Sequence, residues 1–163
     1  MFYDADQFSF TQTLEQHWHI ILDECLALPG SEFDAWPETF LYNRGWDTYG
    51  LIVDRKRVME NCVFCVRTVG LLETIPGLVN AGFSRLAAGT TIGPHVGYTD
   101  AVLRLHLALR SSELCGIRVG DETRRWIPGQ CLIFDDTVDH EAWNHGTSER
   151  LVLLVDFARP PAL

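Results

Sequence analysis

The sequence lacks the features that mark membrane-spanning and nucleic-acid-binding proteins. It contains no stretch of about 18 consecutive apolar residues, the length that a membrane-spanning helix needs. It has no long run of Lys or Arg, and 22 acidic residues outnumber 13 basic ones, giving a formal net charge of -9. Because such a charge repels polyphosphates and anionic lipid head groups, we expect neither a nucleic acid nor a membrane as a partner.

Signals for export and for disulfide bonding are missing as well. Residues 1–6 contain no basic stretch followed by an apolar run, so the sequence predicts a soluble, cytoplasmic protein. The cysteines are five, an odd number that suits a reducing compartment: Cys25, Cys62, Cys65, Cys115 and Cys131. Cys62 and Cys65 form a CxxC motif without a second pair, which favours buried thiols over a metal or redox site.

Two patterns of apolar spacing divide the chain near residue 80. With 163 residues, 47% of them hydrophobic, the chain suits one globular domain, which we expect to cover residues 1–163. Apolar residues three or four apart predict helices at 11–28 and 57–72, with a loop-rich segment at 32–54 between them. The aromatic residues of that segment, which include Trp36 and Trp46, either edge a pocket or, as we expect for most of them, close the core.

After residue 80 the apolar period falls to two, and Gly, Pro, Asn or Asp separate short runs. This pattern predicts eight strands, at 80–87, 90–95, 102–110, 115–119, 122–127, 131–134, 139–145 and 150–156. Eight short strands are typical of a jelly roll. The predicted fold is therefore mainly β with N-terminal helices, in which residues 1–79 form a helical support for a β core at 80–160.

Two arginines of this core are candidates for buried positive charge. In residues 103–109 four leucines alternate with Arg104, His106 and Ala108, so the leucines share one face of a strand while Arg104 and His106 share the other. Burying a charged arginine is costly without an anion, so Arg104 either pairs with an internal Asp or Glu or meets a ligand. Arg150 precedes an apolar strand, where a guanidinium can clamp a carboxylate with two hydrogen bonds.

Two histidines 45 residues apart suit a metal centre: His95, within a Gly-Pro-His-Val-Gly segment, and His140, with Arg150 ten residues later. Neutral imidazole binds Fe, Zn and Cu, and two histidines leave coordination positions for a co-substrate, oxygen or water. A common iron pattern adds a carboxylate two residues after the first histidine, where this chain has Gly97. The spacing favours an iron centre in a small β-barrel, beside an arginine that holds a dicarboxylic co-substrate.

Seven short motifs between residues 83 and 160 carry a family resemblance. They are Gly93-Pro94-His95-x-Gly97, Leu103-Arg104-Leu105-His106-Leu107, Cys115-Gly116-Ile117-Arg118, Glu122-Thr123-Arg124-Arg125-Trp126, Leu132-Ile133-Phe134-Asp135-Asp136, His140-Glu141-x-Trp143 and Arg150-Leu151. In order and spacing they resemble the catalytic domain of the aspartyl/asparaginyl β-hydroxylase family, which are 2-oxoglutarate-dependent iron oxygenases. The resemblance implies that residues 80–160 form a double-stranded β-helix, the cupin-like jelly roll of that family.

The resemblance also implies an Fe(II) site. His95 and His140 would hold the metal without a third protein ligand, because the family too has glycine at the position of Gly97. Asp136 would accept a hydrogen bond from metal-bound water and would orient it without binding the metal. We therefore predict His95, His140 and Asp136 as the catalytic residues.

The binding of the co-substrate follows from the same resemblance. Ser84 and Arg150 match residues that bind the distal carboxylate of 2-oxoglutarate. Arg104 and His106 match positions that line the pocket near the metal-chelating end of that molecule. With O2, the implied reaction hydroxylates the β-carbon of an aspartyl/asparaginyl-like amino acid or small peptide-like substrate and releases succinate and CO2.

The substrate and the reaction outcome are the points that the sequence leaves open. Family members that act on epidermal growth factor-like domains have an arginine two places before the position of Arg104, where this chain has Val102. We therefore expect a small amino-acid or peptide-like substrate, with Arg44, Arg67 or Arg85 as candidate helpers. Related halogenases also lack the carboxylate ligand, since chloride takes its place. A non-oxidative cupin, either a Zn or Ni enzyme or a metal-free binding module, is the other alternative.

Overall fold

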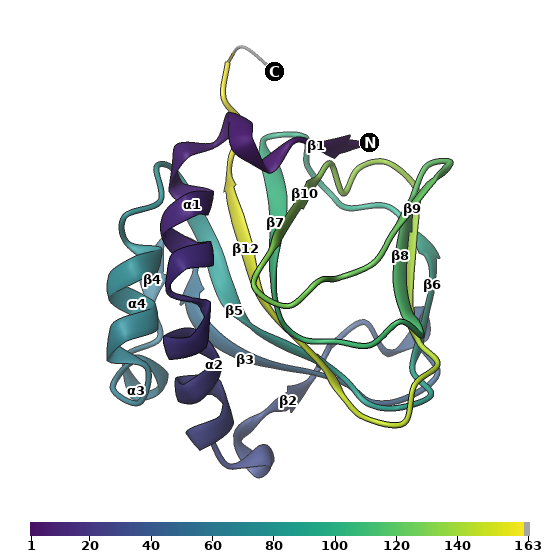
Figure 1. Cartoon of the computed structure of the whole chain (residues 1–163), viewed down its shortest axis with the longest axis horizontal. Helices are drawn as coiled ribbons and strands as arrows, with labels where there is room; N and C mark the ends of the chain where they lie inside the picture. Colours follow the sequence, from purple (N-terminus) through teal and green to yellow (C-terminus); the bar gives the residue numbers. More distant parts are fainter. Residues whose placement is uncertain (162–163) are drawn as a thin grey trace.

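Two antiparallel β-sheets face each other in the computed structural model, which describes residues 1–161 (Figure 1). The larger sheet has the order β1-β10-β7-β12-β5-β3-β2, and β4 pairs with β3. Its strands are β1 (Phe2–Tyr3), β2 (Asp34–Ala35), β3 (Trp46–Val53), β4 (Lys56–Arg57), β5 (Leu78–Leu86), β7 (Val102–Arg110), β10 (Cys131–Phe134) and β12 (Arg150–Ala158). The smaller sheet has the order β6-β11-β8-β9, formed by β6 (Thr91–His95), β8 (Cys115–Val119), β9 (Glu122–Arg124) and β11 (His140–Asn144).

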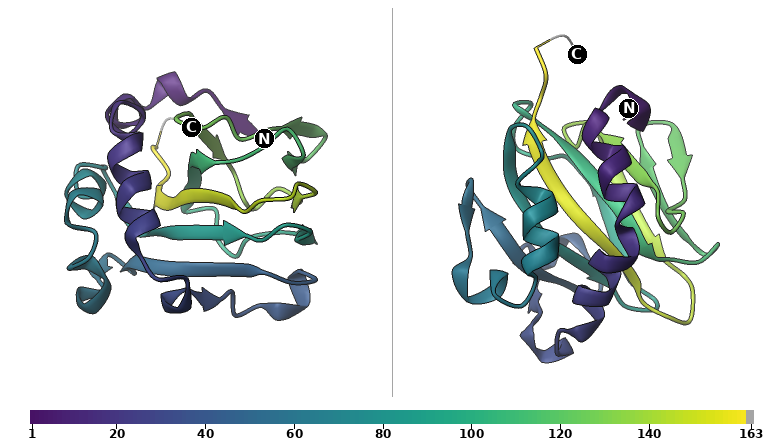
Figure 2. Two further views of the ribbon diagram at one scale, coloured as in Figure 1. Left: turned by 60° about the horizontal axis from the view of Figure 1, so that its bottom comes forward. Right: turned by 60° about the vertical axis from the view of Figure 1, so that its left-hand side comes forward.

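Helices cover the outer face of the larger sheet. They are α1 (Ser9–Gln16), α2 (Trp18–Ala27), α3 (Met59–Cys62) and α4 (Val66–Leu72), and short 3-10 turns lie at η1 (Ala5–Gln7), η2 (Gly30–Glu32) and η3 (Thr39–Leu41). Figure 2 shows α2 and α4 lying side by side against the strands. The smaller sheet lies on the opposite side of the larger one, so the larger sheet is covered on both faces (Figure 1).

Side-chain alternation along the strands produces two hydrophobic clusters. One lies between the larger sheet and the helices, where Leu105 and Leu107 of β7 and Leu153 of β12 pack with Leu14 and Ile21 of the helices. The other lies between the two sheets and includes Trp46, Leu86, Ile117, Val119 and Val152. The predicted alternation in β7 is thus confirmed, because its leucines face the helices and its polar residues face the smaller sheet.

The eight strands predicted after residue 80 are all present. Three of them, β7, β8 and β10, have the predicted bounds, and β9 ends at Arg124, three residues earlier than predicted. The interpretation of residues 32–54 as loop-rich is wrong for residues 46–53, which form β3 and pair with β5. Residues 1–79 therefore contribute the strands β1 to β4 and the start of β5 to the larger sheet as well as helices, while the division into support and core stays a prediction.

Both predicted helices are interrupted. The helix predicted at 11–28 is broken at His17, whose φ of -114° and ψ of 14° lie outside the helical region, giving α1 and α2. The helix predicted at 57–72 is shorter and is broken at Cys65, whose φ is -133° and ψ is 46°. Neither site contains Gly or Pro, the residues that normally announce a break in a sequence.

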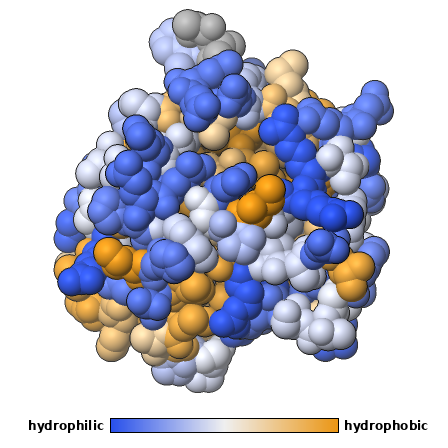
Figure 3. Space-filling model, viewed as in Figure 1, coloured by the Kyte–Doolittle hydropathy of each residue, from blue (hydrophilic) through white to orange (hydrophobic). Residues whose placement is uncertain are grey.

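Apolar side chains reach the surface around the turn between α3 and α4. The exposed residues there are Met59, Val63, Phe64 and Val66, and Figure 3 shows orange side chains gathered on this side of the molecule. In the described part of the chain, each helix is too short or too polar to cross a lipid bilayer. The surface of these helices is thus mixed, with apolar groups concentrated at one turn.

Candidate active site

His95 and His140 meet on the smaller sheet as direct neighbours on paired strands. The Cα of His140 on β11 is opposite the Cα of His95, the last residue of β6. Their ring centroids are 4.2 Å apart and the ring planes are inclined by 53°. The structure thus brings together the two predicted metal ligands, at the edge of the space between the sheets.

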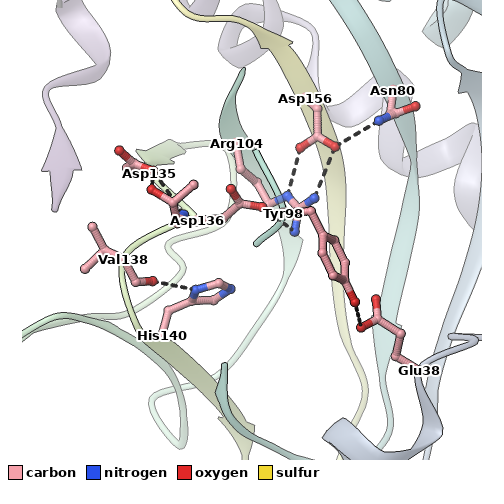
Figure 4. A network of polar contacts seen from close by, with 10 residues as sticks. Glu38, Asn80, Tyr98, Arg104, Asp135, Asp136, Val138, His140 and Asp156 are labelled. Carbon is pink, nitrogen blue, oxygen red and sulfur yellow. Dashed lines mark hydrogen bonds and ion pairs between the residues drawn. The ribbon is translucent and has the colours of Figure 1, made fainter. Parts of the chain in front are cut away.

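The backbone fixes the tautomers of both rings. The Nδ1 atom of His95 lies 2.8 Å from the carbonyl oxygen of Gly93. Nδ1 of His140 lies 2.8 Å from the carbonyl oxygen of Val138, a contact that Figure 4 shows. A carbonyl only accepts, so each Nδ1 carries the hydrogen and each Nε2 keeps a free lone pair. Burial lowers the pKa of His140 to about 4, so its ring is neutral at pH 7. Such rings are ready-made metal ligands.

Asp136 fills the place where a side chain at residue 97 would extend. A Cβ built on Gly97 would lie 2.5 Å from the carboxyl carbon of Asp136, and the Gly97 N–H donates to the Asp136 carbonyl oxygen at 2.6 Å. The carboxylate is buried, its Oδ1 has no hydrogen-bond partner in residues 1–161, and burial raises the pKa of Asp136. Only glycine fits at position 97 while Asp136 stays where it is.

Arg104 forms the internal ion pair that was one of the two interpretations of its position. Its Nε and Nη2 atoms donate to the two carboxylate oxygens of Asp156 at 2.8 and 3.1 Å, and Nη1 lies 3.4 Å from Oδ2 of Asp136 (Figure 4). Asp156 is the cross-strand partner of Arg104 on β12 and also accepts from Asn80. Although burial opposes the charge, these carboxylates raise the pKa of Arg104. Its positive charge is already neutralised.

Arg150 has no such partner. Its side chain is almost fully buried, and within residues 1–161 it donates only to Ser84, from Nη2 to Oγ at 2.9 Å and to the carbonyl oxygen at 3.3 Å. The guanidinium stacks over Trp126 at 4.6 Å from the ring centre, and its Nε is without a partner among the described residues. Burial lowers the pKa of Arg150 to about 9, which shows how costly the uncompensated charge is.

Ser84 has a hydrogen left to donate. Its Oγ accepts from Arg150 and also from the Trp46 indole N–H at 3.1 Å. Because a hydroxyl has two lone pairs and one hydrogen, both acceptor positions are used and the O–H is free. The predicted pair Ser84 and Arg150 therefore lies together, and Trp46, one of the aromatic residues expected mainly to close the core, holds Ser84.

His106 offers a third donor to the same space. The Trp126 indole N–H donates to its Nδ1 at 3.2 Å, so the neutral ring carries its hydrogen on Nε2. Burial lowers the pKa of His106 well below the usual value, with the nearby charge of Arg150 acting in the same direction. Nε2 is buried without a partner in residues 1–161. A buried N–H of this kind requires an acceptor from elsewhere.

All seven predicted site residues border one or both of two cavities that share the walls formed by His95, His140 and Arg104. The inner cavity, about 30 Å³, is lined by both histidine ligands together with Ser84, Arg104, His106 and Arg150. A second cavity, about 70 Å³, lies on the outer side of the histidines and includes Asp136 and Gly97 in its wall. Arg44, Arg67 and Arg85 line neither cavity, and Arg85 is engaged with Asp47 at 3.1 Å.

Three residues that contact the predicted site residues were not themselves predicted as part of the site. Trp126 orients His106 and stacks on Arg150, Trp46 holds Ser84, and Asp156 neutralises Arg104. A signal existed for Asp156, because residues 150, 152, 154 and 156 alternate onto one face of β12. Trp126 stood in one of the motifs, and Trp46 is one of the aromatic residues for which the sequence left a position at a pocket open.

Sequence comparison places the chain among known hydroxylases. Residues 15–160 match the aspartyl/asparaginyl beta-hydroxylase family. The ornithine lipid ester-linked acyl 2-hydroxylase of Rhizobium tropici is 33% identical over 97% of this chain and 60% of its own length. The human aspartyl/asparaginyl beta-hydroxylase is 34% identical over 91% of this chain and 21% of its own length. The chain thus spans less than two thirds of these relatives.

Solved structures confirm the predicted double-stranded β-helix of the cupin type. A protein from Burkholderia pseudomallei, described as an oxidoreductase of the 2OG-Fe(II) oxygenase family, superposes with a TM-score of 0.65, covering 85% of this chain and 76% of its own, at 15% identity. The cupin domain of an XRE-family transcriptional regulator from Enterobacter cloacae gives a TM-score of 0.50 at 14% identity, covering 72% and 100%. At these identities the likeness establishes the fold alone. On the match over residues 15–160, the chain belongs to the aspartyl/asparaginyl beta-hydroxylase family.

Proposed function

We propose that this protein is an Fe(II)- and 2-oxoglutarate-dependent oxygenase that hydroxylates a carbon of a small amino-acid or peptide-like substrate. The observation that carries the proposal is a set of three buried donors that have no acceptor within residues 1–161, the Ser84 hydroxyl, Arg150 Nε and His106 Nε2, beside the free Nε2 atoms of two histidines. Donors and a buried positive charge call for an acceptor-only group, and a carboxylate is that group.

The residues present fit both groups that the family requires. His95 and His140 would hold Fe(II), since both rings present a lone pair on adjacent strands and leave other coordination positions open. Ser84 and Arg150 would bind the distal carboxylate of 2-oxoglutarate, while His106 and Arg104 would border its other end. The inner cavity is narrow, about 30 Å³, so its walls must separate to admit a five-carbon diacid.

The chemistry and its control divide between the bound groups and the chain. When bound, Fe(II) and 2-oxoglutarate supply the oxidation that places one oxygen atom of O2 on a C–H carbon, with succinate and CO2 as co-products. The protein positions the co-substrate and shields it from water. Trp46, Trp126 and Phe134 wall the co-substrate site against water, and Arg150 holds the diacid by one end. The free Oδ1 of Asp136 would accept a hydrogen bond from a water in the outer cavity.

For the target atom, we propose the β-carbon of an amino-acid-like or peptide-like substrate. Family membership supports hydroxylation but does not select the substrate, because the human relative is named for aspartyl and asparaginyl residues and the Rhizobium tropici relative for an ester-linked acyl group. The outer cavity, on the far side of the histidines from Arg150, is the place where the structure offers room for that substrate.

Halogenation, the alternative suggested by Gly97, is disfavoured by Asp136. The place vacated by a side chain at residue 97 is bordered by a buried carboxylate, 2.5 Å from the position of a Cβ. A halide bound to the metal there would lie against this carboxylate, and Arg104 could not offset the repulsion because it is engaged with Asp156. Product mass measured with and without chloride distinguishes the two outcomes.

The oxygenase proposal is tested by loading the protein with Mn(II) and 2-oxoglutarate and measuring the binding of each by calorimetry. We expect His95→Ala and His140→Ala to lose the metal, and the native protein with Fe(II) to form succinate from 2-oxoglutarate. His19→Ala, at an exposed histidine of α2, is the matched control and should bind both groups as the native chain does. Failure of the native protein to bind 2-oxoglutarate in the presence of Mn(II) would overturn the proposal.

A further inference from the structure

A groove with an apolar floor leads from the protein surface to His95. It has a volume of about 450 Å³ and runs between η3 and the end of β6, so that one wall comes from residues 38–41 and the other from residues 93–98. Phe40 and Tyr98 are 81% and 86% exposed, and Val96 is 55% exposed. Large apolar side chains on opposite walls of a concave surface are typical of a ligand site.

The charge of this groove is negative. Among the described residues that line it, none is Arg or Lys, and Glu38 is the one carboxylate. Arg104 borders the adjoining outer cavity, but Asp156 and Asp136 already neutralise it. A substrate that enters past Glu38 therefore meets an acceptor and no free cation.

Glu38 is held at the mouth of the histidine site. The Tyr98 hydroxyl donates to its Oε2 at 2.6 Å, and Figure 4 shows Tyr98 reaching from beside Arg104 to Glu38. This hydrogen bond raises the pKa of Tyr98 and thereby keeps its hydroxyl protonated as a donor. Glu38 lines both the groove and the outer cavity, so a group bound to it lies within reach of either.

We propose that the substrate carries an apolar segment that lies along Phe40, Leu41 and Val96, and a positively charged amino group that binds Glu38. The inference rests on the proposed oxygenase function and narrows its substrate class. An ammonium group supplies the hydrogen-bond donors that a carboxylate accepts, and its charge is opposite to that of Glu38. A carboxylate on the substrate at this point would be repelled, so a free acidic side chain does not suit the groove.

Three probes of equal chain length test the charge preference: octylammonium, octanoate and octan-1-ol, below the concentrations at which they form micelles. Binding is measured by calorimetry on the metal-free protein and again with Mn(II) and 2-oxoglutarate bound. We expect octylammonium to bind at least tenfold more tightly than octanoate, with octan-1-ol between them. Tighter binding of octanoate, or equal binding of all three, would overturn the substrate class.

Substitutions then locate the preference. Glu38→Gln should remove the advantage of octylammonium, and Glu38→Lys should make octanoate the preferred probe. Glu113→Lys introduces the same charge change at an exposed loop residue between β7 and β8 and should leave the order of the probes unchanged. An unchanged order in Glu38→Lys would count against the proposal.

The apolar segment and the oxygenase function are judged separately. Phe40→Ser should weaken all three probes to a similar degree, several-fold, because it removes a wall that they share. If none of the three probes binds, the groove proposal is overturned, even where Mn(II) and 2-oxoglutarate bind. Loss of 2-oxoglutarate binding with the probe order preserved counts against the oxygenase function alone.

Discussion

Two arginines on one face of the larger sheet, Arg104 and Arg150, differ in the groups that surround their side chains. Arg104 has carboxylates from Asp156 and Asp136 within 3.4 Å, whereas within residues 1–161 Arg150 contacts only a serine and an aromatic ring. A buried guanidinium without a counter-charge supports the proposal that Arg150 keeps its charge for a ligand. The contrast between the two residues is the residue-level basis for a carboxylate co-substrate.

Replacing Arg150 with Met separates its role in binding from its role in stability. Arg150→Met should weaken 2-oxoglutarate binding by about 100-fold, or roughly 2.7 kcal/mol. The substitution removes the positive charge and the two hydrogen bonds that the guanidinium would donate to the distal carboxylate. The free energy of unfolding of the ligand-free protein should stay the same or rise, since an uncompensated buried charge is removed. Calorimetry and urea denaturation measure the two effects.

Arg110→Met is the matched control, because Arg110 lies on the neighbouring strand β7 and its partner is Glu149 at 3.1 Å. It should change 2-oxoglutarate binding by less than twofold. A large loss of stability in Arg150→Met without a loss of 2-oxoglutarate binding would mean that Arg150 is a structural residue.

The buried histidines predict how stability depends on pH. Burial lowers the pKa of His140 from 6.5 to about 4, and it lowers the pKa of His106 as well. Below pH 6.5 these imidazoles are protonated in the unfolded chain but stay neutral in the folded chain. The free energy of unfolding therefore keeps its full value above pH 6.5 and decreases toward pH 4. His140 alone accounts for a loss of up to roughly 3 kcal/mol over that interval.

Thermal unfolding of the metal-free protein at pH 7, 6 and 5 measures this dependence. The melting temperature should decrease with pH, and His106→Gln should make the decrease shallower. His19→Gln, at an exposed position, should leave the slope unchanged. If the melting temperature depended equally on pH in the native protein and in His106→Gln, buried His106 would not contribute to the pH dependence of stability.

The sequence predicted which residues border the cavities where those residues lie in a recognisable motif. It did not predict contacts that depend on how two strands pair. Two cavities with shared walls are bordered by the predicted residues, although the roles of these residues stay predictions: His95, His140, Ser84, Arg104, His106, Asp136 and Arg150. The choice between an ion pair and a ligand for Arg104 depended on the register of β12 against β7, which places Asp156 opposite it. Register depends on long-range contacts, so the sequence left both interpretations open.

At the scale of elements, strands with a regular period were predictable and irregular ones were not. β7 alternates apolar and polar residues over much of its length, and its predicted bounds are correct. β3 was missed because its pairing with β5 shifts register between Gly50 and Ile52, which destroys the period of two. The breaks at His17 and Cys65 carry no Gly or Pro, so apolar spacing continued through them.

The pairing of β3 with β5 depends on a close approach at Gly82. A Cβ at Gly82 would lie 2.4 Å from the carbonyl oxygen of Tyr49, which belongs to the paired strand and cannot move cheaply. Gly82→Ala should therefore lower the free energy of unfolding by about 1–3 kcal/mol, measured by urea denaturation.

Gly70→Ala makes the same chemical change in helix α4, where a Cβ would meet nothing within 4 Å. It should raise stability by about 0.5–1 kcal/mol, because alanine loses less conformational freedom in a helix than glycine. If the two variants had equal effects, the tight contact between β3 and β5 would not be what limits position 82.

At the scale of the whole molecule, the site is shared between two sheets. His95 and His140 come from the smaller sheet, and Ser84, Arg104, His106 and Arg150 come from the larger one. The side chains between these groups form the smaller of the two hydrophobic clusters. A ligand that reaches from the histidines to Arg150 therefore connects the sheets through the weaker part of the core.

This arrangement predicts that metal and 2-oxoglutarate stabilise the protein cooperatively. Mn(II) alone contacts one sheet and should raise the melting temperature modestly, whereas 2-oxoglutarate bound together with Mn(II) joins both sheets. We expect Mn(II) to tighten 2-oxoglutarate binding at least tenfold, and the combined rise in melting temperature to exceed the sum of the separate rises. Calorimetric titrations with and without Mn(II), and melting curves in all four ligand states, measure the coupling. Additive shifts would show instead that the two ligands bind independently, and in Arg150→Met the coupling should disappear while the response to Mn(II) alone persists.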